Sequence, residues 1–400
     1  MPKRHFLFCN YEYPPIGGGG STMCQHMAKT LVGLGHTVEV VTAAFSDLPR
    51  FEDHGALTIR RVPALRKLAG QSNPKEMLSY AFSAAPRLLF RKGPLADIIV
   101  SFHSIPSGLV GWPVSRLRGI PHIVRFGGGD VPGWLPGDLE RMHRLTLPIN
   151  RAVVYSADAA IANSDGLRSL AQKAFPKKEI ETTYNAVDTG FYRPAQGPRP
   201  DGPVRLFFAG RMTSQKGMDT LLDALNFLKN RDLPEWRLDA AGEGPMLESF
   251  ETRARDHGLA DRVAFPRFLS RDKVLEGYQR ADLFAFPSRY EGMPCVVLEA
   301  MACGLPIVGT RIMGTEQLVA DNENGFLVPP DRPEELADVL AKVIADSALR
   351  ARLGQKSREL AEAEWSWTRR AVDLSELAER VIERHARKRN HHGGTEARRK

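Results

Sequence analysis

Short apolar runs alternate with amphipathic helical patterns along most of this 400-residue chain. In the first part, an apolar run at His5–Asn10 precedes the glycine run Gly17–Gly20 and a helical pattern over Thr22–Leu34, which Gly35 ends. A further strand-like run at Val38–Thr42 completes a βαβ unit, whose strands lie parallel. The alternation therefore predicts an α/β fold built on parallel sheets.

A second alternating block follows a segment rich in Pro, Gly and Arg, which is typical of a linker. This block begins with a strand at Val204–Ala209 and a helix at Met218–Leu228. The chain is longer than one ordinary core of about 150 residues, so we expect two doubly wound domains. The expected parts are a first domain at 1–190, a linker at 191–203, a second domain at 204–367, a terminal helix at 368–384 for which a return to the first domain is one option, and a basic disordered tail at 385–400.

Composition and charge restrict the class of protein. Hydrophobic residues make up 42% and charged residues 26%, as in soluble globular proteins. No run reaches the roughly 18 apolar residues of a membrane span, and the first apolar run is too short for a signal peptide, so we expect a cytoplasmic protein. The four cysteines lack CxxC spacing, which predicts buried free thiols and no metal site.

Charge is distributed unevenly along the chain. Residues 1–190 contain 22 Lys and Arg against 15 Asp and Glu, whereas residues 191–383 contain 26 against 31. A basic first half suits anionic lipid, an acidic acceptor or nucleic acid. No nucleic-acid-binding motif is present, so we expect no nucleic-acid partner.

The strongest functional signal is the segment Pro287–Gly304, which follows a strand-like run. Pro294 suits the first position of a helix because its missing N–H would have no partner there, and Gly304 suits the helix end. The helix N-terminus would present free amides, which favour an anion. These amides belong to Met293, Cys295 and Val296.

Two carboxylates accompany this predicted helix N-terminus. Glu291 lies just before the helix and Glu299 lies about one and a half turns inside it, among apolar residues. Ligands bind at the carboxyl edge of open α/β sheets. Acids and amides gathered there suit a sugar, a ribose and a diphosphate; the alternative is two solvated surface carboxylates.

Two further loops follow strands of the second block. Arg211 and Lys216 lie on the first loop and can neutralise a diphosphate leaving group; the alternative is a solvated basic loop. Gly242 and Gly244 lie on the next loop, where glycine permits close approach of a ligand. The chain contains no Asp-x-Asp metal motif, which fits charge stabilisation by Arg and Lys without a metal.

Taken together, the Gly-Arg…Lys-Gly loop, the Gly-x-Gly loop and the Glu-x7-Glu helix resemble the family-4 retaining glycosyltransferases of the GT-B fold. The resemblance covers nearly the whole chain. It implies two Rossmann-like doubly wound domains facing each other across a cleft, and a metal-independent enzyme without a cofactor. The donor would be a nucleoside-diphosphate sugar, and the acceptor a carbohydrate or lipid-linked hydroxyl in polysaccharide or glycolipid synthesis.

The resemblance also implies roles for single residues. Glu291 would contact the donor sugar and the reacting centre, and Glu299 would accept hydrogen bonds from the ribose. The diphosphate would be bound by Arg211 and Lys216, by the helix start at Met293, Pro294 and Cys295, and by Gly19 and Gly20 of the first domain.

The acid or base of the first domain departs from the family pattern. Similar enzymes place a His after the strand that here is His122–Arg125, but this chain has Gly127 at that position. His103, at another strand end, and Asp130, on the same loop as Gly127, are the catalytic candidates. Each also has a structural interpretation, His103 as an ordinary folded histidine and Asp130 as a turn cap.

The segment Arg60–Lys92 mixes basic and apolar residues, which suits either the anionic inner face of a membrane or a solvated basic face. Other enzymes on similar domains, such as an epimerase or a phosphorylase, fit the donor motifs less well. A nicotinamide-dependent dehydrogenase would require a GxGxxG motif, which is interrupted by Thr22. A non-catalytic nucleotide-sugar-binding protein remains an alternative because of Gly127.

Overall fold

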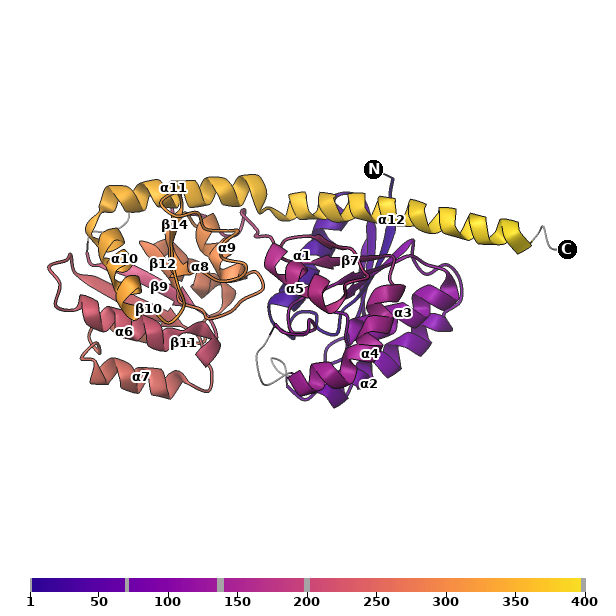
Figure 1. Ribbon diagram of the computed structural model, residues 1–400, viewed down its shortest axis with the longest axis horizontal. Helices are drawn as coiled ribbons and strands as arrows, with labels where there is room; N and C mark the ends of the chain where they lie inside the picture. Colours follow the sequence, from indigo (N-terminus) through magenta and orange to yellow (C-terminus); the bar gives the residue numbers. More distant parts are fainter. Residues whose placement is uncertain (1, 69–71, 135–139, 198–201, 397–400) are drawn as a thin grey trace. The chain divides into compact units, whose positions relative to one another are not determined.

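The computed structural model describes residues 2–68, 72–134, 140–197 and 202–396, with side chains at all of these except 140–141 and 390–396 (Figure 1). Their contacts divide the chain into two compact units, Met1–Asn185 with Trp367–Lys400, and Ala186–Ser366. Each unit contains one mainly parallel sheet with helices packed on it. The predicted two-domain α/β fold is confirmed.

The first unit contains an eight-stranded sheet in the order β3-β4-β2-β1-β5-β6-β7-β8. All neighbouring strands pair in parallel except β3 and β4, which form an antiparallel hairpin at one edge. The central strands β5 and β6 are buried along their whole length, and β1 is buried except at His5, as expected where helices cover both faces. The strands are β1 (His5–Cys9), β2 (Thr37–Ala43), β3 (Phe51–His54), β4 (Leu57–Val62), β5 (Ile98–Phe102), β6 (His122–Arg125), β7 (Ala159–Ala162) and β8 (Ile180–Thr182).

The helices of the first unit pack in two groups. Helix α1 contacts α12, whereas α2 contacts α3 and α3 contacts α4, on the side away from α12 (Figure 1). Helix α1 begins three residues earlier than predicted, so Gly19 and Gly20 lie in its first turn rather than in the preceding loop. The helices are α1 (Gly19–Gly33), α2 (Pro74–Leu89), α3 (Ser107–Arg118), α4 (Glu140–Ser156), α5 (Asp165–Ala174) and α12 (Trp367–Glu396).

Helix α12 belongs to the first unit and continues well into the predicted disordered tail. Glu379 pairs with Arg4 at 2.7 Å. Further along, the His385 ring lies 3.1 Å from Asp158, and Arg389 donates to a backbone carbonyl of the turn after α3. These contacts give the basic end of the helix partners on the unit. Residues 397–400 of the predicted tail lie outside the described residues.

The second unit contains a six-stranded parallel sheet in the order β11-β10-β9-β12-β13-β14. The strands are β9 (Val204–Ala209), β10 (Trp236–Ala241), β11 (Val263–Arg267), β12 (Leu283–Phe286), β13 (Ile307–Thr310) and β14 (Gly325–Val328). The helices are α6 (Met218–Leu228), α7 (Leu247–Asp256), α8 (Arg271–Arg280), α9 (Cys295–Ala302), α10 (Pro333–Ala345) and α11 (Ser347–Glu364), with a short 3₁₀ turn, η1 (Ser214–Lys216).

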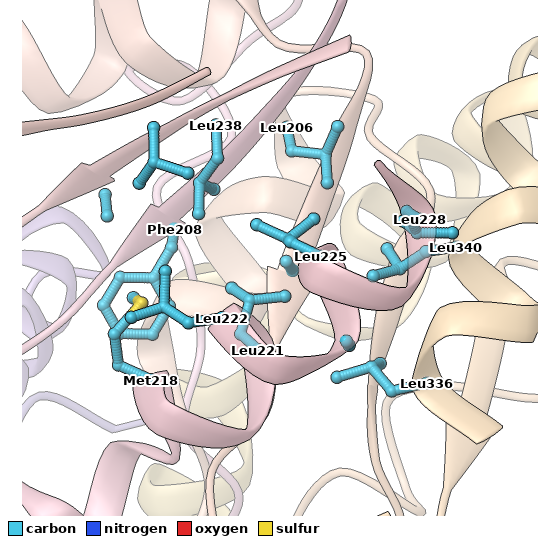
Figure 2. Close-up of a cluster of buried hydrophobic side chains, with 14 of the residues drawn as sticks. Leu206, Phe208, Met218, Leu221, Leu222, Leu225, Leu228, Leu238, Leu336 and Leu340 are labelled. Atoms are coloured by element: carbon cyan, nitrogen blue, oxygen red, sulfur yellow. The ribbon is translucent and has the colours of Figure 1, made fainter. Parts of the chain in front are cut away.

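The core of the second unit fills the space between this sheet and the helices on one of its faces (Figure 2). Helix α6 presents an apolar face at the spacing that its sequence predicts, and each fully buried side chain contributes about 1.5–3 kcal/mol. This rigid layer supports the loops that follow β9 and β10. The core includes Leu206, Phe208, Met218, Leu222, Leu225, Leu238, Leu336 and Leu340.

Residues 191–194 of the expected linker contact the second unit. The ring of Tyr192 lies 6.0 Å from that of Tyr278, and the Tyr192 carbonyl accepts a hydrogen bond from Arg358 at 2.9 Å. Gln279 donates to the carbonyl of Arg193 at 3.1 Å. The aromatic side chain of Tyr192 therefore anchors a segment that its Pro and Gly content predicts to be a linker. Residues 198–201 lie outside the described residues.

Candidate functional site

The loops that carry most of the predicted donor-site residues leave neighbouring strands of the second sheet. Strand β9 lies between β10 and β12, and the chain moves to one side of β9 for β10 and to the other for β12. Such a reversal of strand order forms a crevice at the carboxyl edge of the sheet. The loops after β9, β10 and β12 therefore meet there, with Arg211 and Lys216 on the first, Gly242 and Gly244 on the second and Glu291 on the third.

Lys216 and Glu291 form an ion pair at this edge. Their side chains are only 16% and 13% exposed, so the contact is more protected than a surface pair. Gly217, which follows Lys216, has a φ of +63°, and a Cβ there would lie 2.0 Å from the carbonyl oxygen of Pro287. A glycine is therefore required for the lysine loop to reach the end of β12.

Arg289, which the sequence interpretation did not single out, joins the same two loops. Its backbone N–H donates to the carbonyl of Gln215 at 2.8 Å, and its guanidinium bonds both carboxylate oxygens of Asp219 at 3.0 and 2.8 Å. Asp331 accepts from it as well, at 2.8 Å. The Asp219 hydrogen bond, reinforced by Asp331, raises the pKa of Arg289. The side chain thus positions the segments that carry Lys216 and Glu291.

The helix after Glu291 begins one residue later than predicted. Pro294 is the N-cap, with φ −74° and ψ 112°, and α9 runs from Cys295 to Ala302. The carbonyl of Pro294 accepts a hydrogen bond from the N–H of Val297 at 3.2 Å. A Cβ on Gly314 would lie only 2.3 Å from the carbonyl oxygen of Gly292. This close approach fixes the chain just before the helix. The first turn of an α-helix favours an anion.

A cavity of about 420 Å³ lies beside these loops. Glu299 of α9 lines it, and the hydroxyl of Tyr278 donates to Glu299 Oε2 at 3.0 Å. Burial raises the pKa of Glu299 to about 7, against the opposing effects of the Tyr278 and Tyr192 hydroxyls and the charge of Arg271. Other lining residues are Arg211, Gly242, Glu243, Phe268, Leu269 and Val274.

The cavity therefore combines the weakly acidic Glu299 and a second carboxyl group, that of Glu243, with two arginines and an exposed aromatic ring. Phe268 is 75% exposed. The guanidinium of Arg271 lies 5.4 Å from the ring of Tyr192. Neither Tyr192, Tyr278, Phe268 nor Arg271 was identified from the sequence, because a lone aromatic or basic residue outside a motif gives no signal of its own.

Gly242 and Gly244 have a packing role. Gly242 has a φ of +145°, and a Cβ there would lie 1.8 Å from the carbonyl oxygen of Gly210. A Cβ on Gly244 would lie 2.4 Å from the carbonyl oxygen of Met212. Both glycines thus let the loop after β10 lie against the loop after β9, and Gly242 also lines the cavity.

The predicted residues of the first unit form a separate cluster at the carboxyl edge of its own sheet. His103 follows β5 in a left-handed conformation, with φ +74°, and its N–H donates to the carbonyl of Arg125 at 2.7 Å. Its ring lies against two glycines. An ideal Cβ atom on Gly20 would lie 3.2 Å from the ring, and one on Gly127 would lie 2.2 Å from it. The imidazole thus occupies the space that a side chain at position 127 would enter.

Asp130 lies in this cluster, where its contacts point to a structural role. One carboxylate oxygen accepts from the amides of Gly127 and Gly128 at 3.0 and 3.1 Å. The other accepts from the N–H and hydroxyl of Ser104 at 2.8 and 3.2 Å. Asp130 is only 8% exposed, and its carboxylate accepts from four donors. These hydrogen bonds fix the loops after β5 and β6. They account for Asp130 without a role in proton transfer.

The glycine run before α1 leaves open space. Ideal Cβ atoms on Gly18 and Gly19 would meet nothing within 4 Å, whereas one on Gly17 would lie 2.5 Å from Glu12 Oε2. Gly17 is therefore required by the turn, and Gly18 and Gly19 leave room for a ligand at the start of the helix.

The basic segment Arg60–Lys92 spans β4, a loop and α2, and only part of it faces solvent. Arg61 and Arg66 are buried and pair with Glu52 and Glu12, so they do not contribute to a basic surface. Within the described ranges, no helix is both long and apolar enough to cross a membrane. The same ranges contain no group of three or more His, Cys, Asp or Glu side chains arranged to bind a metal ion.

Comparison with known proteins agrees with a sugar-transferring enzyme. Residues 17–191 match the family described as glycosyltransferase family 4, and residues 193–360 match glycosyl transferases group 1. A GDP-mannose-dependent alpha-(1-6)-phosphatidylinositol monomannoside mannosyltransferase of Mycolicibacterium smegmatis is 31% identical over 389 residues, covering 93% of this chain and 97% of that protein.

Solved structures share the whole fold. Sucrose-phosphate synthase from Thermosynechococcus elongatus superposes with a TM-score of 0.81 at 20% identity, covering 96% of this chain and 100% of that one. Anabaena HepE in complex with UDP and glucose gives a TM-score of 0.72 at 19% identity, covering 94% and 99%. The chain therefore belongs to the group 1, family-4 glycosyltransferases and has the GT-B fold.

Proposed function

We propose that this glycosyltransferase moves a sugar from a nucleoside diphosphate to an acceptor hydroxyl, with retention of the anomeric configuration and without a metal ion. The observation that carries the proposal is the meeting of Lys216, Arg211, Glu291 and the start of α9 at one sheet edge, beside a cavity that contains Glu299. The mannosyltransferase relative is named for a GDP-sugar donor, and HepE was solved with UDP and glucose, which supports a nucleotide-sugar donor here.

In the proposed reaction, the bond between the anomeric carbon and the diphosphate oxygen breaks, and the bond to the acceptor oxygen forms. The acceptor hydroxyl passes its proton to an oxygen of the departing diphosphate, which leaves with the bonding electron pair. Arg211, Lys216 and the α9 amides stabilise that growing negative charge. Glu291 contacts the transferred sugar, and Glu299 accepts hydrogen bonds from the ribose hydroxyls of a nucleoside held in the cavity.

The first unit supplies the acceptor side in this proposal. Gly18 and Gly19 leave open space for a ligand at the start of α1, and the His103 ring lies against Gly20. In this proposal His103 makes the polar contact with the reacting sugar or the acceptor, and Asp130 fixes the loops. The acceptor is proposed to be a carbohydrate or lipid-linked hydroxyl at the cytoplasmic face of an anionic membrane, since the relative acts on a phosphatidylinositol mannoside.

The test replaces Lys216 by Ala and measures nucleoside diphosphate release from UDP-, GDP- and ADP-sugars, with and without acceptor extracts. Loss of one charge-stabilising group should lower the rate by roughly 10²–10³. The matched control is Lys177→Ala, an exposed lysine of the first unit. Turnover of Lys216→Ala close to that of Lys177→Ala would exclude the assigned role.

Two measurements separate the alternatives. NMR gives the anomeric configuration of the product. A configuration opposite to that of the donor sugar would exclude retention. Tight nucleotide-sugar binding in calorimetry without any release of nucleoside diphosphate, in the presence of every acceptor extract, would favour a non-catalytic binding protein. Activity that survives EDTA supports the metal-independent mechanism.

A further inference from the structure

The proposed reaction gives Lys216 and Glu291 different partners, the diphosphate and the transferred sugar, yet the structure pairs them with each other. Lys216 Nζ donates directly to Glu291 Oε1, and both side chains are largely shielded from water. This contact engages the positive charge that a diphosphate would require. The pairing of the two residues therefore competes with the binding of a diphosphate by the lysine.

The ammonium group of Lys216 has a second neighbour, which does not change with the anion that it binds. Its Nζ lies 5.9 Å from the centroid of the Phe286 ring. Phe286 is the last residue of β12 and is 1% exposed, so the sheet fixes the ring. An aromatic face attracts a cation at this distance. The strand end thus keeps the ammonium at the carboxyl edge of the sheet whichever anion it binds.

Other contacts join the two loops that carry the ion pair. The side-chain amide of Gln215 donates to the carbonyl of Tyr290 at 2.9 Å, and the N–H of Arg289 donates to the carbonyl of Gln215 at 2.8 Å. The Arg289 guanidinium also bonds both carboxylate oxygens of Asp219. Because these hydrogen bonds do not involve the ion pair, the pair can open while both loops keep their positions.

A shielded ion pair is costly to break on one side alone, because the remaining charge has lost both water and its partner. Glu291 is therefore destabilised when Lys216 binds a diphosphate, unless another donor reaches the carboxylate. The hydroxyl groups of the transferred sugar are such donors, since a carboxylate accepts hydrogen bonds from hydroxyls. A free nucleoside diphosphate has no sugar beyond its second phosphate, so it leaves Glu291 without this compensation.

We propose that this ion pair makes the enzyme select the complete sugar nucleotide over the free nucleoside diphosphate, with Glu291 as the specificity-determining residue. Glu291 withholds Lys216 from a diphosphate that lacks a sugar, and it releases the lysine when sugar hydroxyls bind the carboxylate. After transfer, the nucleoside diphosphate product no longer compensates Glu291, so the carboxylate regains Lys216 and weakens product binding. The inference rests on the proposed function and adds to it the means by which donor and product are distinguished.

The test is calorimetric titration of the full chain with UDP, GDP, UDP-glucose and GDP-mannose, without acceptor. Glu291→Gln should bind the preferred free nucleoside diphosphate about tenfold more tightly than wild type, which corresponds to about 1.4 kcal/mol. The same variant should bind the matching sugar nucleotide no more tightly than wild type, because it has lost the carboxylate that contacts the sugar. Loss of a merely structural residue would weaken both ligands. Unchanged or weaker binding of the free nucleoside diphosphate would overturn the inference.

A double substitution separates competition for Lys216 from simple repulsion between Glu291 and the diphosphate. Lys216→Ala keeps Arg211 and the α9 amides as diphosphate ligands, so binding is weakened but measurable. In this background Glu291→Gln should change the affinity by less than about twofold, since there is no ammonium to release. A tenfold gain in both backgrounds would indicate repulsion alone and would refute the competition.

A matched control is available on α8. Lys273 Nζ lies 2.8 Å from Glu276 Oε1 in an exposed Lys–Glu pair. Glu276→Gln removes the same charge from the second unit and should leave the affinities for the free and the sugar-linked nucleotide unchanged. A gain in nucleoside diphosphate affinity as large as that of Glu291→Gln would assign the effect to net charge and overturn the inference.

Failure of this inference and failure of the proposed function give different results. If these loops do not bind a diphosphate, Lys216→Ala will leave the affinities for UDP and GDP at their wild-type values. If they bind one without competition from Glu291, Lys216→Ala will weaken binding but Glu291→Gln will not strengthen it. Thermal unfolding without ligand checks that each variant folds. Glu291→Ala, which leaves no side-chain acceptor for the lysine, should give the same gain as Glu291→Gln and provides a second measurement.

Discussion

Replacing Glu299 by Gln should make the protein more stable above neutral pH while weakening nucleotide binding. Burial raises the pKa of this carboxyl group from 4.5 to about 7, because the ionised form loses water that Tyr278 and Tyr192 only partly replace. The amide that replaces the carboxyl group would keep an acceptor for the Tyr278 hydroxyl without carrying a charge. The substitution therefore separates the cost of a buried charge from its use in binding ribose.

The magnitude follows from linkage. A carboxyl group whose folded pKa lies above its unfolded pKa binds more protons in the folded state, so stability falls as pH rises from about 4.5 to about 7. A shift of this size corresponds to about 3 kcal/mol, to order of magnitude. With roughly 2–4 °C per kcal/mol, Glu299→Gln should raise the Tm at pH 8.5 by about 6–12 °C and leave it nearly unchanged at pH 4.5.

The assay is the Tm of wild type and variant between pH 4.5 and 8.5, followed by calorimetric titration with UDP and GDP. The control is Glu334→Gln, an exposed residue in the first turn of α10. Wild-type affinity should rise with pH through 7, because ribose hydroxyls donate to the ionised form, and Glu299→Gln should bind weakly at every pH. A variant whose Tm and affinity follow the wild-type pH profiles would refute both the raised pKa and the ribose contact.

Three other substitutions test the loops around the two clusters. Gly127→Ala should displace the His103 ring, cost about 1–3 kcal/mol and lower transfer as much as His103→Ala does; wild-type transfer would contradict the role of the ring. Gly242→Ala should lower stability by about 1–3 kcal/mol in thermal unfolding, from its positive φ and the approaching carbonyl, whereas Gly18→Ala should change it by under about 0.5 kcal/mol; similar Tm values would count against the loop packing. Arg289→Lys should lose the paired contact to Asp219, cost about 1 kcal/mol and lower kcat in the transfer assay with folding retained; an unchanged kcat would remove its positioning role.

The sequence predicted the buried central strands of both sheets well, because continuous apolar runs between turns have few alternative structures. Helix α6 and strands β6 and β9 have the bounds that the pattern predicted. The antiparallel hairpin of β3 and β4 was missed, since Phe51–His54 is largely exposed and its residues lack a clear alternation. Helix α12 exceeded its prediction because its basic end is held by partners on distant segments.

The motifs located the donor-site loops, but they did not reveal which residues position those loops. Arg289 lies inside the strongest motif, yet its partners Asp219 and Asp331 come from segments 70 and 42 residues away. Tyr278 reaches Glu299 from another helix. Pairings of this kind depend on the three-dimensional path of the chain, and a single sequence contains no local pattern that encodes them.

Glycine shows most clearly where pattern and structure differ. In the second unit, Gly217 and Gly242 have backbone carbonyls within 2.0 Å of the place where a Cβ would lie, so they bring loops together. In the first unit, Gly18 and Gly19 have nothing within 4 Å of that place, so they leave space in front of a helix start. The first pair determines where the charged side chains lie, and the second pair is the one suited to direct contact with a ligand. Glycine-rich loops after strands thus have two different uses in this chain, and only the surroundings of each missing Cβ distinguish them.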